Sequence, residues 1–278
     1  YFVDFNFGYN GSENFAAGHQ FGFFPAYSIA WNMAEESFIK EKSPWINMFK
    51  VRYSYGKVGN DNMERRFPYL STFGASNNYN YADLGQNYQF DGLTYTYYAT
   101  NAVTWEIATK HDVGVDFSLF NDKLTGTIDY FHEQRDGIYQ ERNYIPLSVG
   151  MYGTGTGMKL STNIVSKGFD GNLGYKQRIG DVNLTLRGNF TYSKSEILKY
   201  DEEFSNYPYK SQQGFRVNQT RGLISLGLFK DYDDIRDSPK QSWGDVMPGD
   251  IKYADVNGDG KIDENDEVPI GATNRPNL

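Results

Sequence analysis

The 278-residue sequence contains no cysteine, which excludes disulfide bonds and cysteine nucleophiles but leaves the cellular compartment open. It also has no run near the ~18 consecutive apolar residues that a membrane-spanning helix requires. Basic residues are outnumbered: 27 Lys and Arg against 35 Asp and Glu give a net charge of −8. We therefore expect no nucleic-acid partner, because phosphate tracking depends on clustered basic side chains.

Signatures of enzymatic chemistry are also missing. The sequence has no Gly-x-Ser-x-Gly nucleophile elbow, and its acidic pairs fall in polar stretches that solvent would cover. The three histidines, His19, His111 and His132, do not follow a zinc-binding spacing, so we expect them at the surface or in an interfacial belt. The prediction is no catalytic site and no enzyme.

Aromatic residues are abundant, by contrast. There are 23 Tyr and 20 Phe, yet the mean hydropathy is only −0.64. This combination argues against a soluble core of Leu, Ile and Val, and it suits a sheet with one apolar face and one wet, polar face. Strict alternation of apolar and polar residues, the period of a β-strand, is clear in YFVDFNFGY (1–9), FFPAYSIAWNM (23–33) and FKVRYSYGK (49–57).

Two β-hairpins follow from turn chemistry. Residues 111–120 and 123–132 flank Asn121-Asp122, while 168–179 and 182–194 flank Gly180-Asp181. Each strand has about 10 residues, longer than the ~5–6 usual in soluble proteins and long enough to cross a bilayer at a tilt.

Connections at the opposite ends of these strands are long and polar, covering 57–104, 134–166 and 195–278. Short turns on one side and long loops on the other are typical of outer-membrane barrels. The predicted fold is all-β: an antiparallel transmembrane β-barrel segment with long extracellular loops. A large soluble β-sandwich with one solvated face is the alternative. Tyrosines and amides alternate over 76–100, which suits sugar stacking, peptide binding or loop packing equally, so no substrate-contacting residue is predicted.

Four segments, in order, resemble parts of SusC/RagA-type TonB-dependent outer-membrane transporters. They are FGFFPAYSIAWNMAEESF (21–38), INMFKVRYSYGKVGND (46–61), WEIATKHDVGVDFSLFNDKLTGTIDYFHEQRDGIY (105–139) and PGDIKYADVNGDGKIDENDEVPIG (248–271). The combination of the third and fourth segments is highly specific.

The resemblance implies more than the periodicity does. Such transporters belong to the plugged, 22-stranded class of bacterial outer-membrane barrels, and import oligosaccharides or peptides with force delivered by TonB. A SusD-type surface lipoprotein closes them as a lid. The matching residues 1–278 correspond to a later part of the barrel, so we expect the chain to be a fragment that lacks the plug domain and the TonB box. Membrane lipid is then a further expected partner.

Residues 255–266, DVNGDGKIDEND, follow the pattern of an EF-hand calcium loop inside the long 195–278 loop. Gly260 stands at the sixth position and Ile262 at the eighth, where an apolar anchor is usual. The last position carries Asp in place of Glu, which weakens bidentate binding and leaves Ca²⁺ and Mg²⁺ both open. The predicted ligands are Asp255, Asn257, Asp259, Lys261 (through its carbonyl), Asp263 and Asp266.

An Asx-rich turn that binds no metal is the alternative for this loop. Four carboxylates in one short loop would repel one another without a cation, so we favour a structural cation. No helix that could reorient is evident on either side, which argues against a sensor.

Two functions remain open at this stage. One is the barrel subunit of a SusCD-type importer in the bacterial outer membrane. The other is a soluble, calcium-stabilised β module that binds glycans or proteins at the cell surface. The importer predicts a set of residues that face lipid: Phe23, Tyr27, Ile29, Trp31, Val113, Val115, Phe117 and Leu119.

Overall fold

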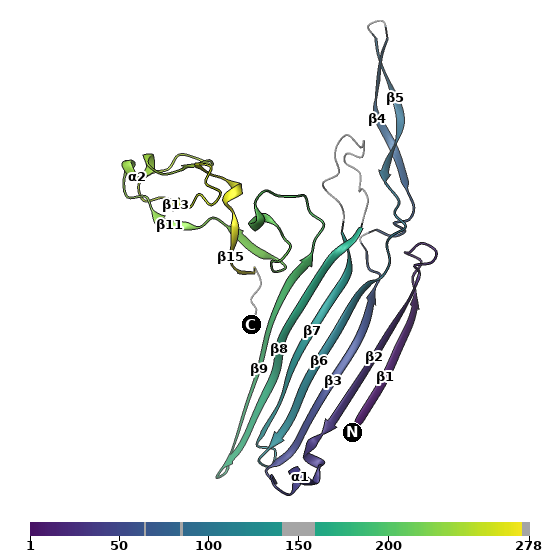
Figure 1. Cartoon of the computed structure of the whole chain (residues 1–278), viewed down its shortest axis with the longest axis vertical. Coiled ribbons are helices and arrows are strands. Elements are labelled where there is room, and N and C mark those ends of the chain that lie inside the picture. The colour runs from purple at the N-terminus through teal and green to yellow at the C-terminus, as the bar shows by residue number, and fades with distance from the viewer. Residues whose placement is uncertain (64, 84–85, 141–158, 274–278) are drawn as a thin grey trace. The chain divides into compact units, whose positions relative to one another are not determined.

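A computed structural model describes residues 1–63, 65–83, 86–140 and 159–273 (Figure 1). The chain divides into two compact parts, which we call the sheet unit (Tyr1–Asp201) and the C-terminal unit (Glu202–Asn277). No helix in the described ranges is long and apolar enough to cross a membrane.

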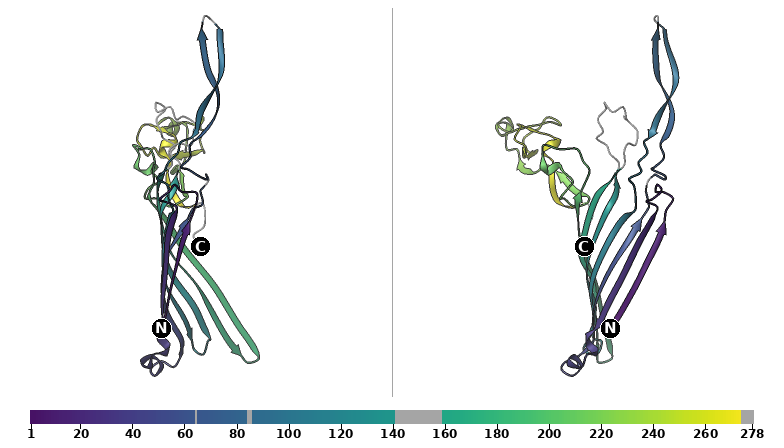
Figure 2. Two further views of the ribbon diagram at one scale, coloured as in Figure 1. Left: turned by 90° about the vertical axis from the view of Figure 1, so that its right-hand side faces the viewer. Right: turned by 45° about the vertical axis from the view of Figure 1, so that its right-hand side comes forward.

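The sheet unit is dominated by one antiparallel sheet of seven long strands in the order β1-β2-β3-β6-β7-β8-β9 (Figure 1). Figure 2 shows it from two further directions as a single twisted layer. The strands are β1 (Phe2–Gly11), β2 (Phe21–Asn32), β3 (Ile46–Asn60), β6 (Glu106–Leu119), β7 (Leu124–Gln140), β8 (Lys159–Ile179) and β9 (Val182–Lys199).

Every strand predicted from alternation is present, so the all-β, antiparallel prediction is confirmed. The strands are longer than predicted, most clearly β8, which begins at Lys159 instead of 168. The extensions lie mainly at the ends joined to the long connections, where glycine and polar residues obscure the period. Backbone pairing with the neighbouring strand decides the strand end there.

The two predicted turns differ in construction. Gly180 and Asp181 form a two-residue turn between the paired residues Ile179 and Val182, with Gly180 at φ +61°. A positive φ at the first central residue is typical of a type II′ turn, which glycine favours. The other connection has four residues, 120–123, because Leu119 pairs with Leu124. Positive φ values at Phe120, Asn121 and Asp122 close it.

At this end of the sheet, β2 joins β3 through a 3₁₀ turn, η1 (Met33–Glu35), and the short helix α1 (Ser37–Lys40). The other end carries the 12–20 connection and the long 61–105 segment. The latter, which we predicted as a long polar connection over 57–104, contains an antiparallel hairpin of β4 (Thr72–Asp83) and β5 (Gln86–Tyr97). Tyrosine is common in β-strands as well as in binding loops, so the tyrosine-rich composition of this segment is compatible with either structure.

The C-terminal unit is built from short elements. Its small sheets pair β10 with β15, β11 with β13, and β12 with β14, the last pair in parallel. The elements are η3 (Pro208–Lys210), β10 (Gln219–Gly222), β11 (Ser225–Leu228), α2 (Tyr232–Arg236), β12 (Lys240–Gln241), β13 (Ile251–Tyr253), β14 (Lys261–Ile262), η4 (Glu264–Asp266) and β15 (Val268–Thr273). The region predicted as one long loop, 195–278, thus comprises the end of β9 and a compact unit.

Candidate functional site

The seven-stranded sheet has two chemically distinct faces, which the register keeps separate across all strands. One row, for example, runs through Val3, Ile29 and Tyr53 to Val113 and Tyr130. We call this side the apolar face. It carries all eight residues predicted to face lipid: Phe23, Tyr27, Ile29, Trp31, Val113, Val115, Phe117 and Leu119.

Large hydrophobic side chains on the apolar face remain exposed within this chain. Phe5, Phe7 and Phe23 are 62%, 65% and 56% exposed, and the pattern continues to Phe190, at 42%, on the last strand. A patch that spans seven strands is far larger than the few hundred Å² that soluble monomers tolerate. Its neighbour is therefore not water, as expected for a lipid-facing barrel wall.

The opposite side, which we call the polar face, is organised around Arg52 of β3. Its guanidinium contacts three aspartates from β6 and β7: Nη2 lies 2.6 Å from Asp129 Oδ1, Nε lies 3.3 Å from Asp116 Oδ2, and Nη1 lies 3.4 Å from Asp112 Oδ1. Asp129 is buried, and Asp170 pairs with it from β8. One cation among several acids leaves a local excess of negative charge on this face.

Gly114 makes this cluster possible. It pairs with both Arg52 and Asp129, so the guanidinium and the carboxylate meet above it. A Cβ at this position would lie 2.1 Å from Asp129 Oδ1 and 2.7 Å from Arg52 Cζ, closer than atoms can approach. A larger residue here would have to displace both side chains, so Gly114 preserves the space in which they meet.

A second ionic group lies nearer the long connections. Lys110 Nζ is 3.3 Å from Glu133 Oε2, and Arg135 contacts both Glu133 and Glu106. Beyond it, Phe24 of β2 and the loop residues Phe15, Val103 and Trp105 form a small core, in which the Trp105 indole N–H donates to the Gln20 carbonyl at 3.1 Å. The polar face thus carries two ionic clusters and, near the long connections, a small aromatic core.

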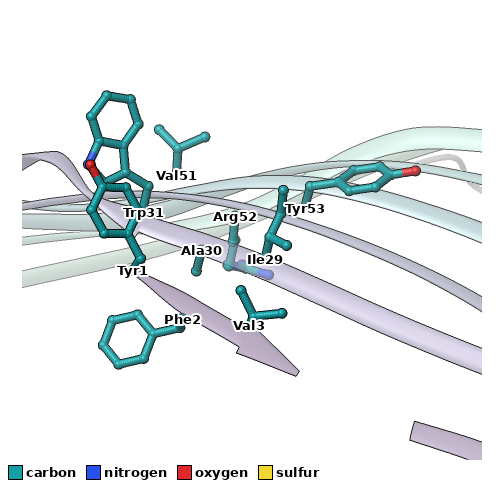
Figure 3. Close-up of a pocket in the computed structure, with 9 residues that line it drawn as sticks. All are labelled: Tyr1, Phe2, Val3, Ile29, Ala30, Trp31, Val51, Arg52 and Tyr53. Carbon is teal, nitrogen blue, oxygen red and sulfur yellow. The ribbon is translucent and has the colours of Figure 1, made fainter. Parts of the chain in front are cut away.

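A pocket of about 390 Å³ lies at the opposite end of β1, β2 and β3 (Figure 3). The Tyr1 and Trp31 rings stack with centroids 6.0 Å apart, and both donate to Glu36 Oε1, at 3.0 and 2.9 Å. Most of its lining belongs to the apolar face, so we assign it to the membrane-facing surface. The lining residues are Tyr1, Phe2, Val3, Ile29, Ala30, Trp31, Val51, Arg52 and Tyr53.

The predicted metal loop lies in the C-terminal unit and has the expected turn geometry. Gly260 has φ +82°, the left-handed conformation that calls for glycine. Ile262 is fully buried, as expected of the apolar anchor, and belongs to β14, which pairs with β12.

Side chains of the predicted ligands accept hydrogen bonds from the loop's own amides. Asp255 accepts from Gly258 at 2.7 Å and from Gly260 at 2.8 Å. Asp266, which is fully buried, accepts from three N–H groups: Val256 at 2.8 Å, Asn257 at 3.3 Å and Asp263 at 2.9 Å. Asn257, Asp259 and Asp263 accept similarly from Asp259, Lys261 and Asn265.

These contacts hold the six predicted positions in one compact loop, with Asp259 and Lys261 exposed and Asp255, Asn257 and Asp263 half-buried. Carboxylate and amide oxygens are the donors that hard cations prefer, so the residue types fit Ca²⁺ or Mg²⁺. Among the described residues, however, no three acidic or histidine side chains converge as a ready ligand set. The metal site therefore stays a prediction.

Tyr209 packs against the same loop. Its hydroxyl donates to the Asn265 carbonyl at 2.7 Å, and Lys210 donates to the Asn265 side chain at 3.0 Å. Burial, and then the negative charge of Asp266, raise the pKa of Tyr209. The phenol is therefore a neutral donor at physiological pH. Sequence reasoning did not identify this residue or the Arg52 cluster, because both depend on contacts between distant segments.

Comparison with known proteins shows which proteins this chain resembles. No family model matches the chain. It is 28% identical to the TonB-dependent receptor P3 of Formosa agariphila over 94% of its length, and 25% identical to the TonB-dependent receptor SusC of Bacteroides thetaiotaomicron over 96%. The chain spans about a quarter of these relatives, 26% of each.

Solved structures show the same architecture. The RagAB peptide importer matches 99% of this chain with a TM-score of 0.70 in its closed-closed state and 0.72 in its open-open state, at 16% identity. The chain covers 29% and 28% of those chains, and at this identity the likeness concerns the fold alone. The expected resemblance to SusC/RagA-type TonB-dependent transporters is confirmed, and the sheet has the fold of a segment of such a transporter's barrel wall.

Proposed function

We propose that the chain forms part of the barrel of an outer-membrane importer, with the apolar face against lipid and the polar face lining the lumen. The observation that carries this proposal is the separation of the two faces over seven registered strands, with large side chains exposed on one and ion clusters on the other. The relatives named as TonB-dependent receptors support it.

In this proposal, TonB supplies energy through a plug domain, and a SusD-type lipoprotein covers the extracellular mouth. The cargo is an oligosaccharide or a peptide. The RagAB structures concern a peptide importer, whereas SusC is named only as a receptor, so both cargo classes stay open. Because the relatives are named as receptors and importers, the proposed function involves no enzymatic step.

The C-terminal unit follows the strand end opposite the short turns, so we place it on the extracellular side, where such barrels carry their long loops. Its loop 255–266 would hold Ca²⁺ or Mg²⁺ through Asp255, Asn257, Asp259, the carbonyl of Lys261, Asp263 and Asp266. The cation would be structural, since the short strands β13 and β15 flank the loop and the described residues on either side include no long helix that could reorient.

Extraction and unfolding test the barrel proposal directly. We expect the protein to sediment with outer membranes, to need detergent for solubility, and to keep its fold in cold SDS. Release into buffer as a soluble protein would contradict the proposal and favour the soluble β module. The cargo question is then addressed by purifying the complex with its lid and identifying retained ligands by mass spectrometry.

A further inference from the structure

A row of basic and aromatic residues ends the apolar face near the long connections. In register, it runs through Tyr55, His111, His132, Lys167 and Lys194 on five neighbouring strands. The adjoining row, nearer the short turns, is apolar or aromatic on the last four of these strands: Val113, Tyr130, Phe169 and Tyr192. The expectation that His111 and His132 lie in an interfacial belt agrees with this placement.

Lys167 and Lys194 stand directly opposite each other on β8 and β9. Like charges at directly opposed positions destabilise a sheet unless a counter-charge lies between them. Neither lysine has an ion pair with the described residues, and Lys167 is exposed. The nearest acid in sequence on the same face, Glu196, pairs with Val165 in the next row.

The position of Lys167 and Lys194 along the strands indicates which negative group could neutralise them. Short turns mark the periplasmic side and long connections the extracellular side, so the row lies at the outer-leaflet boundary. Lysine stems at that depth run along the apolar surface while their ammonium groups reach the lipid headgroups. We propose that Lys167 and Lys194 bind a phosphate group of an outer-leaflet lipid, with His132 beside Lys167 as an additional donor.

Two double variants on the same pair of strands separate this site from general charge effects. Lys167→Gln with Lys194→Gln removes two cations from the apolar face. Lys176→Gln with Arg187→Gln removes two exposed cations from the polar face of β8 and β9. Both variants should migrate in cold SDS like the unaltered protein, which checks that the barrel is folded.

Each protein would be extracted in detergent and stripped of lipid. It would then be titrated separately with phosphorylated lipid A and with the same lipid after dephosphorylation, and inorganic phosphate would be added as a competitor. Native mass spectrometry would count the bound lipid molecules. A lysine near an anionic membrane surface contributes about fivefold in affinity, so losing two should weaken the binding of phosphorylated lipid A on the order of 25-fold. The polar-face variant should bind like the unaltered protein.

Three results would overturn the proposal. One is equal binding of phosphorylated and dephosphorylated lipid, which would assign retention to acyl-chain contacts. The second is equal loss in both double variants. The third is displacement of lipid by inorganic phosphate at low millimolar concentration, which would mean a free-anion site. None of these outcomes bears on import, because each one measures lipid binding at the apolar face and not transport of cargo.

Discussion

The sheet unit and the C-terminal unit use the same chain chemistry in opposite ways. In the sheet unit, strands of 10 to 21 residues satisfy their backbone through continuous ladders, and side chains project to two different environments. In the C-terminal unit, strands have two to six residues, and aspartate and asparagine side chains hold the backbone together. The long strands of the sheet unit require a suitable environment on each face of the sheet. The C-terminal unit, whose backbone is held by side-chain hydrogen bonds, instead requires specific contacts between residues close in sequence.

The largest effect should come from placing a charge on the apolar face. Leu173 and Asn172 are neighbours on β8 and project to opposite faces, Leu173 opposite Gly188 and Asn172 opposite Asn189. Leu173→Arg should destabilise the folded barrel by about 2–4 kcal/mol, because the guanidinium enters the lipid-facing band. Asn172→Arg should change stability by less than about 0.5 kcal/mol. Urea unfolding in lipid vesicles measures both, and equal effects would mean that the faces are wrongly assigned.

Removing Arg52 should have the next largest effect, by stranding three carboxylates. Arg52→Gln should cost on the order of 2 kcal/mol, less than a fully buried ion pair because the side chain is one-third exposed. Adding Asp129→Asn should recover part of the loss, since it removes one of the repelling charges. Unfolding free energies of the two single variants and the double variant give the coupling. Strict additivity would show that the two residues do not interact.

Metal removal probes the C-terminal unit alone. If loop 255–266 holds a cation, treatment with a chelator should expose this loop to proteolysis, and adding Ca²⁺ back should protect it again. Asp259→Asn should reduce this protection. The sheet unit should be cleaved equally in all samples, because its ladders do not depend on the loop. Identical loop cleavage with and without metal would favour the self-closed Asx-rich turn.

The smallest predicted effect is a pH dependence in the C-terminal unit. A hydrogen bond from the Lys252 ammonium at 2.7 Å, and then one from the Lys230 amide at 3.1 Å, hold the pKa of Asp234 below its usual range. A carboxyl group whose pKa is lower in the folded state than in the unfolded state stabilises the fold. This contribution is complete at pH values above the unfolded-state pKa, about 3.9, and is lost as the pH falls through the folded-state pKa.

Hydrogen exchange around α2 should therefore accelerate below about pH 4, after correction for intrinsic rates. Asp234→Asn should abolish this dependence. Asp233→Asn serves as the matched control, because it lies one residue away and, among the described residues, its carboxylate forms an ion pair only with the exposed Arg236. A pH dependence that persists in Asp234→Asn would assign the effect to another group.

Local chemistry was readable from the sequence alone. Period-2 alternation identified β1, β2 and β3 and their two faces, because successive side chains on a strand necessarily point to opposite sides, and turn chemistry identified the β6–β7 and β8–β9 hairpins. Gly180-Asp181 identified a hairpin, and the Asp-Asn-Gly pattern of 255–266 correctly required a left-handed Gly260 and a buried Ile262. Each of these features depends on neighbours within a few residues.

Only the tertiary structure decided the contacts made through register. The ion cluster of Arg52 with Asp112, Asp116 and Asp129 unites residues up to 77 positions apart, and the pairing of Lys167 with Lys194 depends on an entire hairpin. A shift of two residues in any pairing would keep both faces and change every cross-strand partner, and no local pattern excludes that shift across long connections. Composition likewise could not separate a loop from the β4–β5 hairpin, because the same tyrosines and polar residues satisfy either until backbone partners are available.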